Sequence, residues 1–230
     1  MKLVKYFTDF FNLFYPEQCA ACRGKLLRQE KVICTNCLLD MPTTGYQPGI
    51  ENPVSQLFWG RVNIEGACSY FHFRKLSKYQ HLLHQLKYNG RKDVGVELGR
   101  QFGYIIGKSL HEQKVSVIIP VPLHPKRERK RGYNQSTMIA EGISVATNIP
   151  VDETSVRRVV STTTQTKKTR LERWQNVENI FDITNGQLLS NKHILLIDDV
   201  VTTGATLEAC AQALLRIDGV KVSIATLAQA

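Results

Sequence analysis

The chain has 230 residues, of which 43% are hydrophobic and 22% are charged, a balance typical of a globular protein with one large domain or one domain plus a small module. Its formal net charge of +10 favours an anionic partner such as phosphate, nucleic acid or a membrane surface, although a generally basic, solvated surface would give the same charge. No segment is long and apolar enough to span a bilayer, so we expect no membrane insertion.

The first sixteen residues are predicted to form an amphipathic helix. Six apolar side chains recur there at helical spacing and share one face: Leu3, Val4, Phe7, Phe10, Phe11 and Phe14. We expect this face to dock on the protein itself, with a membrane-surface helix as the alternative. Thr8, Asp9 and Asn12 interrupt the apolar core that a secretory signal would need, so a cytoplasmic location is expected.

Four of the six cysteines form two Cys-x-x-Cys pairs with eleven residues between them: Cys19, Cys22, Cys34 and Cys37. Two such turns can aim four thiolates at one tetrahedral metal, which predicts a structural zinc site. Disulfides and a redox-active pair are the alternatives, but thiols stay reduced in the cytoplasm. We expect positive φ at Gly24, in the turn after the first pair. Cys68 and Cys210 lie in apolar stretches and are predicted to fill the core.

A stretch rich in proline and glycine follows the cysteines and reads as a linker. We place the domain boundary near residues 50–60, which gives an N-terminal helix plus zinc-binding module over 1–50 and a larger domain over 60–230.

Strands and helices alternate through the larger domain. Strands are predicted at 66–73, 115–119, 155–160, 193–197 and 221–228. Helices are predicted at 75–88, 94–110, from about 135 to 147, and 205–217, with a loop from 120 to about 135. This alternation indicates an α/β fold with a parallel sheet and helices on both faces. In such sheets, ligands bind at the carboxyl ends of the strands.

Two polar, basic segments lie next to predicted strand ends. The first contains five basic residues within six positions: Lys126, Arg127, Arg129, Lys130 and Arg131. They could neutralise a pyrophosphate, contact a DNA backbone, or form an ordinary solvated charge run. The second segment, between Thr162 and Arg173, is a long polar loop that could fold over a bound pyrophosphate or simply be disordered. Its candidate residues are Gln165, Lys167, Lys168, Arg170 and Arg173.

The stretch "ILLIDDVVTTGAT" (194–206) places two adjacent carboxylates, Asp198 and Asp199, at the end of the most apolar strand. The following turn into a helix could bind a phosphate through free backbone N–H groups and threonine hydroxyls. Its residues are Thr202, Thr203, Gly204, Ala205 and Thr206. Carboxylates beside a phosphate site could hold sugar hydroxyls, so the pattern favours a ribose 5-phosphate. The glycine motifs of P-loops and dinucleotide-binding folds are absent.

This stretch resembles the phosphoribosyl-pyrophosphate (PRPP) motif of type I phosphoribosyltransferases. Further segments resemble the ComF/GntX family of phosphoribosyltransferase-like proteins, which are linked to competence and DNA uptake. These are the four-cysteine module, "LKYNGRKD" (86–93), "IIPVPLHPKRERKRGYNQS" (118–136) and "TQTKKTRLERWQN" (164–176). The resemblance covers nearly the whole chain and implies a parallel-sheet type I phosphoribosyltransferase-like fold with a small zinc module.

The resemblance also implies roles for these residues. Asp198 and Asp199 would contact the ribose hydroxyls, and residues 202–206 would hold the 5′-phosphate. The loop after Pro120 would contact pyrophosphate, the segment 162–173 would be the mobile loop, and magnesium would accompany PRPP. No catalytic residue and no role for the segment 86–93 could be assigned from the sequence.

Two functions remain open at this stage. One is a phosphoribosyltransferase (a pentosyl glycosyltransferase) that acts on an unidentified acceptor. The other is a non-enzymatic accessory protein that binds single-stranded DNA with the DNA-uptake machinery and uses PRPP only as a sensed ligand. For that second role, Tyr133 or Trp174 could stack on bases. Both readings keep a PRPP pocket, since adjacent carboxylates would repel DNA phosphates.

Overall fold

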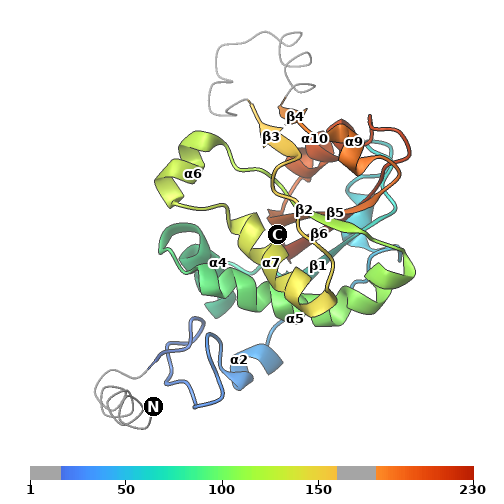
Figure 1. Ribbon diagram of the computed structural model, residues 1–230. Coiled ribbons are helices and arrows are strands. Elements are labelled where there is room, and N and C mark those ends of the chain that lie inside the picture. Colours follow the sequence, from blue (N-terminus) through green and yellow to red (C-terminus); the bar gives the residue numbers. More distant parts are fainter. Residues whose placement is uncertain (1–16, 160–179) are drawn as a thin grey trace.

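The computed structural model describes residues 17–159 and 180–230. Its centre is a four-stranded sheet in the order β1-β6-β5-β2, and every neighbouring pair is parallel (Figure 1). The strands are β1 (Gly66–His72), β2 (Val117–Pro120), β5 (His193–Val201) and β6 (Lys221–Gln229). The predicted parallel α/β fold is therefore confirmed.

Helices cover both faces of the sheet, because both faces of each central strand are apolar. In β5, Leu195 and Ile197 belong to one buried cluster, whereas Ile194 and Leu196 belong to the other. The first cluster packs beneath three helices: α4 (Lys78–Tyr88), α5 (Lys92–Glu112) and α7 (Gln135–Thr147). The second lies beneath α3 (Pro53–Gln56) and α10 (Ala205–Leu214).

Glycines bring α5 and α7 into backbone contact. They recur every four residues along α5, at Gly95, Gly99, Gly103 and Gly107. A Cβ on Gly99 would overlap the carbonyl oxygen of Ile139, and one on Gly142 of α7 would overlap that of Val96. This close packing fixes α7, whose first turn lies at the carboxyl edge of the sheet.

Two sequence predictions need correction. The loop expected from 120 to about 135 contains the short helix α6 (Pro125–Arg131), which begins with proline at N1 and ends at Gly132 with a φ of 80°. The strand expected at 155–160 does not join the main sheet. It forms β3 (Val156–Arg158), which pairs antiparallel with β4 (Phe181–Ile183), a strand that we did not predict.

The cysteine-rich segment packs against α4, at the end of the molecule opposite β3 and β4 (Figure 1). The Gln85 amide donates to the Ala20 carbonyl at 2.8 Å, and the Tyr79 hydroxyl donates to the Cys37 carbonyl at 3.0 Å. This segment includes helix α2 (Thr35–Leu39), and a further short helix, α9 (Gly186–Leu189), precedes β5. The boundary near 50–60 stays a prediction, and the expected helix over 1–16 lies outside the described residues.

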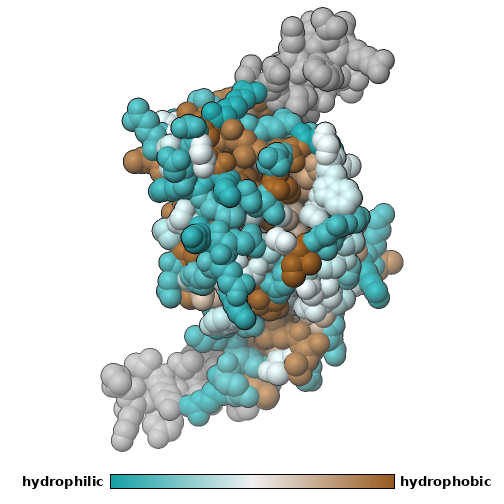
Figure 2. Space-filling model, turned by 90° about the vertical axis from the view of Figure 1, so that its right-hand side faces the viewer, coloured by the Kyte–Doolittle hydropathy of each residue, from teal (hydrophilic) through white to brown (hydrophobic). Residues whose placement is uncertain are grey.

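Hydrophilic residues cover most of the face shown in Figure 2. On the face shown in Figure 2, brown hydrophobic areas are separated by teal hydrophilic ones. Across the described ranges, none of the helices combines the length and the apolar character needed to cross a bilayer.

Candidate functional site

Strand β5 carries the two adjacent aspartates within the sheet. The strand continues to Val201 rather than ending at residue 197, because β6 continues beside it and pairs Asp198 with Thr226. Both aspartates therefore have fixed backbone positions near the carboxyl edge. Strand geometry sends their side chains in different directions, so each has its own set of partners.

The Asp198 carboxylate is partly buried and accepts two hydrogen bonds on Oδ1. The Ser136 hydroxyl donates at 2.9 Å, and the backbone N–H of Asp199 donates at 2.8 Å. Burial raises the pKa of Asp198 to about 7, and the neighbouring charge of Asp199 adds to this, while the two hydrogen bonds oppose it. Burial and the neighbouring charge therefore destabilise the ionised carboxylate of Asp198. Hydrogen bonds donated by a ligand would stabilise it.

The Asp199 carboxylate is 6% exposed and meets two donors on Oδ2. The Gln135 amide donates at 3.0 Å, and the Lys87 ammonium lies at 3.0 Å. Lys87 belongs to the segment 86–93, to which no role could be assigned from the sequence. It lies in the last helical turn of α4, and this part of the helix faces the acidic pair. The helix ends immediately afterwards, at Asn89 and Gly90.

The predicted phosphate-binding residues form the turn between β5 and α10. Gly204, with a φ of 73°, is the N-cap of this ten-residue helix. Because glycine has no capping side chain, the N–H groups of the first turn are not used by one. Asp198 and residues 200–207 line a small cavity of about 80 Å³. The helix N-terminus, the exposed Thr202 and Thr203 and a compact cavity together suit one phosphate group.

Arg61 binds this turn, a role that its local sequence does not indicate. Its guanidinium donates to the carbonyls of Thr203 and Leu57, both at 2.8 Å, and pairs with Glu208 in the first turn of α10. The ring of Phe58 packs directly against Gly204. Only the fold brings residues 57–61 and 203–208 together, so no local sequence pattern could have shown this.

The five predicted basic residues lie on α6. Four are exposed, and the fifth, Arg131, is partly buried. Arg131 donates to the Gln135 amide oxygen at 2.7 Å, and its guanidinium carbon lies 5.4 Å from the ring centroid of Tyr88. Through Gln135, α6 is therefore connected to Asp199.

Arg158 on β3 interacts electrostatically with Arg127 of α6 and with Asp198, and its local sequence does not indicate this position. Burial lowers its pKa, the nearby Arg127 adds to this, and the charge of Asp198 opposes it. Arg157 and Arg158 line a cavity of about 430 Å³ with His124 and Glu128. The candidate mobile-loop residues, Gln165, Lys167, Lys168, Arg170 and Arg173, lie outside the described residues, as does Trp174.

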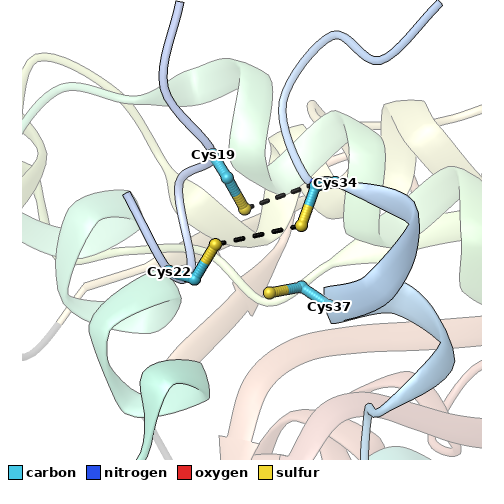
Figure 3. A group of neighbouring side chains, drawn as sticks. All are labelled: Cys19, Cys22, Cys34 and Cys37. Carbon is cyan, nitrogen blue, oxygen red and sulfur yellow. Dashed lines mark hydrogen bonds between the residues drawn. The ribbon is translucent and has the colours of Figure 1, made fainter. Parts of the chain in front are cut away.

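The four predicted zinc ligands come together (Figure 3). Their sulfur atoms all lie within 4.8 Å of one another, and Cys22 Sγ is 3.9 Å from Cys34 Sγ. Zn–S bonds of about 2.3 Å in a tetrahedron place sulfurs roughly 3.8 Å apart, so the cluster is compatible with zinc. Cys68 and Cys210 are fully buried, as predicted.

Backbone N–H groups point at these sulfurs. Those of Ala21 and Cys34 donate to Cys19 Sγ at 3.4 and 3.3 Å, and that of Gly24 donates to Cys22 Sγ at 3.4 Å. Burial opposes ionisation of Cys19, but backbone hydrogen bonds from Cys22, Cys34 and Ala21 prevail and lower the pKa of Cys19 to about 7, which favours the thiolate form that binds metal. The prediction for Gly24 was wrong, because the left-handed residue in this turn is Arg23.

Comparison with known proteins places this site in a family. A model of the phosphoribosyl transferase domain matches residues 113–230, which include the acidic pair, the phosphate turn and α6. The chain belongs to the phosphoribosyl transferase domain family. The matched region lacks β1, α4 and α5, so these parts of the sheet and site come from the preceding residues.

Individual relatives extend the match. Competence protein F of Haemophilus influenzae is 27% identical over 96% of this chain and 99% of its own length. DNA utilization protein YhgH of Escherichia coli K12 is 31% identical over 62% of this chain and 63% of its own length. These similarities confirm the ComF resemblance. The purine phosphoribosyltransferase of Pyrococcus horikoshii is 20% identical, covers 56% of this chain and 72% of its own, and has a TM-score of 0.39.

Proposed function

We propose that this phosphoribosyl transferase domain binds PRPP with magnesium at residues 198–206 and transfers its phosphoribosyl group to an acceptor. One observation carries the proposal: two carboxylates held by β5 lie directly beside a turn that offers the free N–H groups of helix α10. The 5′-phosphate would occupy the turn at 202–206, and the ribose hydroxyls would donate to Asp198 and Asp199.

Electrostatics would assist the departure of pyrophosphate. As the C1–O bond breaks, C1 becomes cation-like and the pyrophosphate takes the electron pair, so a protein nucleophile is not needed. Arg158 and the α6 residues Arg127 and Arg131 would supply positive charge to the pyrophosphate, in addition to Lys87 beside Asp199. The acidic pair would offer magnesium the carboxylate oxygens that this ion prefers, and the ion would supply positive charge to the departing pyrophosphate.

Calorimetry with PRPP and magnesium tests this proposal. Replacing Asp199→Asn should weaken PRPP binding by about 1.5–3 kcal/mol, because a charge-assisted hydrogen bond is lost. The matched control is Asp182→Asn, which changes an exposed aspartate on β4. Wild-type protein that does not bind PRPP, or equal losses in both variants, would contradict the proposal.

A second candidate function is binding of single-stranded DNA in DNA uptake, as an accessory role beside or instead of transfer. The supporting observation is the exposed basic face of α6, and the relatives are named as competence and DNA utilization proteins. Tyr133 is not available to stack on bases, because it is 7% exposed and its hydroxyl donates to the Leu86 carbonyl. Tyr88, 65% exposed and next to Arg131, could take that role.

Titration of a labelled single strand at several salt concentrations, with and without PRPP, tests the second function. Affinity should fall steeply with salt, and replacing Arg127, Arg129 and Arg131 together by alanine should weaken it. A control variant removes the same charge from the cysteine-rich segment, by replacing Lys25, Arg28 and Lys31 with alanine. An affinity that does not change with salt would contradict the electrostatic account of DNA binding. A loss of affinity only in the control variant would place the DNA on the cysteine-rich segment.

A further inference from the structure

Helix α4 contacts the cysteine-rich segment on one side and the acidic pair on the other. Gln85 and Lys87 are two residues apart in this helix, and at 3.6 residues per turn such side chains point to nearly opposite sides. The Gln85 amide donates to the Ala20 carbonyl at 2.8 Å, whereas the Lys87 ammonium lies 3.0 Å from a carboxylate oxygen of Asp199. A single turn of helix therefore contacts both places.

The contact with the cysteine-rich segment is buried and involves the metal-binding turns themselves. Ala20 lies within the first Cys-x-x-Cys turn, and it is 2% exposed while Gln85 is 8% exposed. The Tyr79 hydroxyl donates to the carbonyl of Cys37, the last of the four cysteines. Because a buried carbonyl that loses its donor is destabilised, these two hydrogen bonds hold α4 and the cysteine turns in one arrangement.

This arrangement depends on the metal that the four sulfurs fit. Small segments whose thiolates bind zinc take much of their folding free energy from the metal and unfold without it. In the unfolded segment, Gln85 and Tyr79 would lose their acceptors, and α4 would no longer be held in place. Lys87 would then leave Asp199, and the adjacent charges of Asp198 and Asp199 would be less compensated.

We propose that Gln85 is a positioning residue through which the zinc-binding segment holds Lys87 in the PRPP site. Zinc at the four cysteines and a ligand at the acidic pair are thereby coupled, and each raises the protein's affinity for the other. This inference rests on the proposed function. Coupling between two binding sites is reciprocal, so both affinities change by the same factor. A segment that only stabilised its own part of the fold would not respond to a ligand at the acidic pair.

Equilibrium competition for zinc between the full chain and a coloured chelator tests this coupling. The titration is run without ligand and with saturating ribose 5-phosphate, which carries the phosphate and the ribose hydroxyls but has no pyrophosphate to lose. Ribose 5-phosphate should raise the affinity for zinc by about tenfold, within the usual range of roughly 5–150-fold for coupled sites. Calorimetry should show the same factor as a weaker binding of ribose 5-phosphate once zinc is removed.

Two variants test whether the coupling passes through α4. Gln85→Met keeps the length of the side chain but removes the donor to Ala20, so most of the gain in zinc affinity should disappear. Lys87→Met leaves the contacts with the cysteine-rich segment in place, so it should still bind zinc but lose the gain. Gln101→Met is the matched control and should keep the gain, because Gln101 donates to Glu97 on its own helix, α5.

The outcomes separate this inference from the proposed function. Ribose 5-phosphate that binds without changing the zinc affinity would overturn the coupling and leave the site at residues 198–206 standing. A gain that persists in both Gln85→Met and Lys87→Met would overturn it too, because the coupling would not pass through α4. A chain that does not bind ribose 5-phosphate would refute this inference, and if PRPP does not bind either, the proposed function would be refuted as well.

Discussion

Replacing Asp198→Asn should stabilise the folded protein at neutral and higher pH while weakening its binding of PRPP. Asparagine has nearly the same shape, and its carbonyl oxygen can still accept hydrogen bonds from the Ser136 hydroxyl and the Asp199 N–H. The substitution therefore removes one of two adjacent negative charges without opening a cavity. The substitution also removes the carboxylate that we propose accepts a hydrogen bond from a ribose hydroxyl of PRPP.

The magnitude follows from the raised pKa. The pKa of Asp198 is about 7 in the folded chain, compared with 3.8 ordinarily, and this difference corresponds to about 4 kcal/mol at 1.36 kcal/mol per pKa unit. The carboxyl is partly accessible to water, which reduces the effect, so we expect a gain of about 1–2 kcal/mol above pH 7.

The dependence on pH has a definite sign. Because the folded protein holds the Asp198 proton more tightly than the unfolded chain, this carboxyl's contribution to stability is complete below pH 3.8 and is lost as pH rises through about 7. The stability advantage of Asp198→Asn should therefore grow from about pH 5 to about pH 8.

Urea unfolding of wild type and variant across this pH range measures the effect, with Asp182→Asn on β4 as the control for removing an exposed charge. A variant no more stable than wild type at the upper end of the range would refute the reasoning. An advantage that does not change with pH would refute it as well.

The four-cysteine cluster, the contact of Arg61 with the phosphate turn and the packing of α5 on α7 can each be tested by a single substitution. We expect the four-cysteine cluster to bind zinc, so Cys34→Ser should abolish zinc binding and unfold the cysteine-rich segment, measured by metal analysis and circular dichroism, while Cys68→Ser should leave zinc binding intact. Arg61→Met should weaken ribose 5-phosphate binding by about 1 kcal/mol in calorimetry, because the Thr203 carbonyl loses its donor, whereas the exposed Arg216→Met should not. Gly142→Ala should lower the free energy of unfolding by about 1–3 kcal/mol, since its Cβ would overlap the Val96 carbonyl, while Gly186→Ala, with ordinary contacts of 3.4 Å or more, should not.

The sequence was most informative where function depends on neighbouring residues. Strand β5, the turn at 202–206 and α10 form one continuous segment, so the acidic pair and the candidate phosphate site could be located from a single pattern. The paired spacing of the cysteines was equally local. Five of the six strands in the described residues were predicted from their apolar runs. The place of β3 could not be predicted, because its pairing with β4 depends on residues more than twenty positions later.

The parts that the sequence did not show are contacts between distant segments. Lys87, Arg61 and Arg158 reach the site from α4, from the turn after α3 and from β3. Each is an ordinary basic residue in its local context, and only the packing of the chain gives it a partner. The helix α6 was missed because its seven residues have no buried side chain, and hence no apolar periodicity to recognise.

The position of β6 in the sheet has a consequence for how the chain reaches its folded state. This strand lies between β1 and β5, and the Ser69 and Thr226 hydroxyls that join it to β1 are 157 residues apart. Until residues 221–229 are in place, β1 has no partner in the main sheet and β5 has one open edge. Such long-range pairing makes folding slow and leaves apolar strand edges exposed to other chains. Nascent or truncated chains without β6 should therefore be the aggregating species, because β6 fills the gap between β1 and β5.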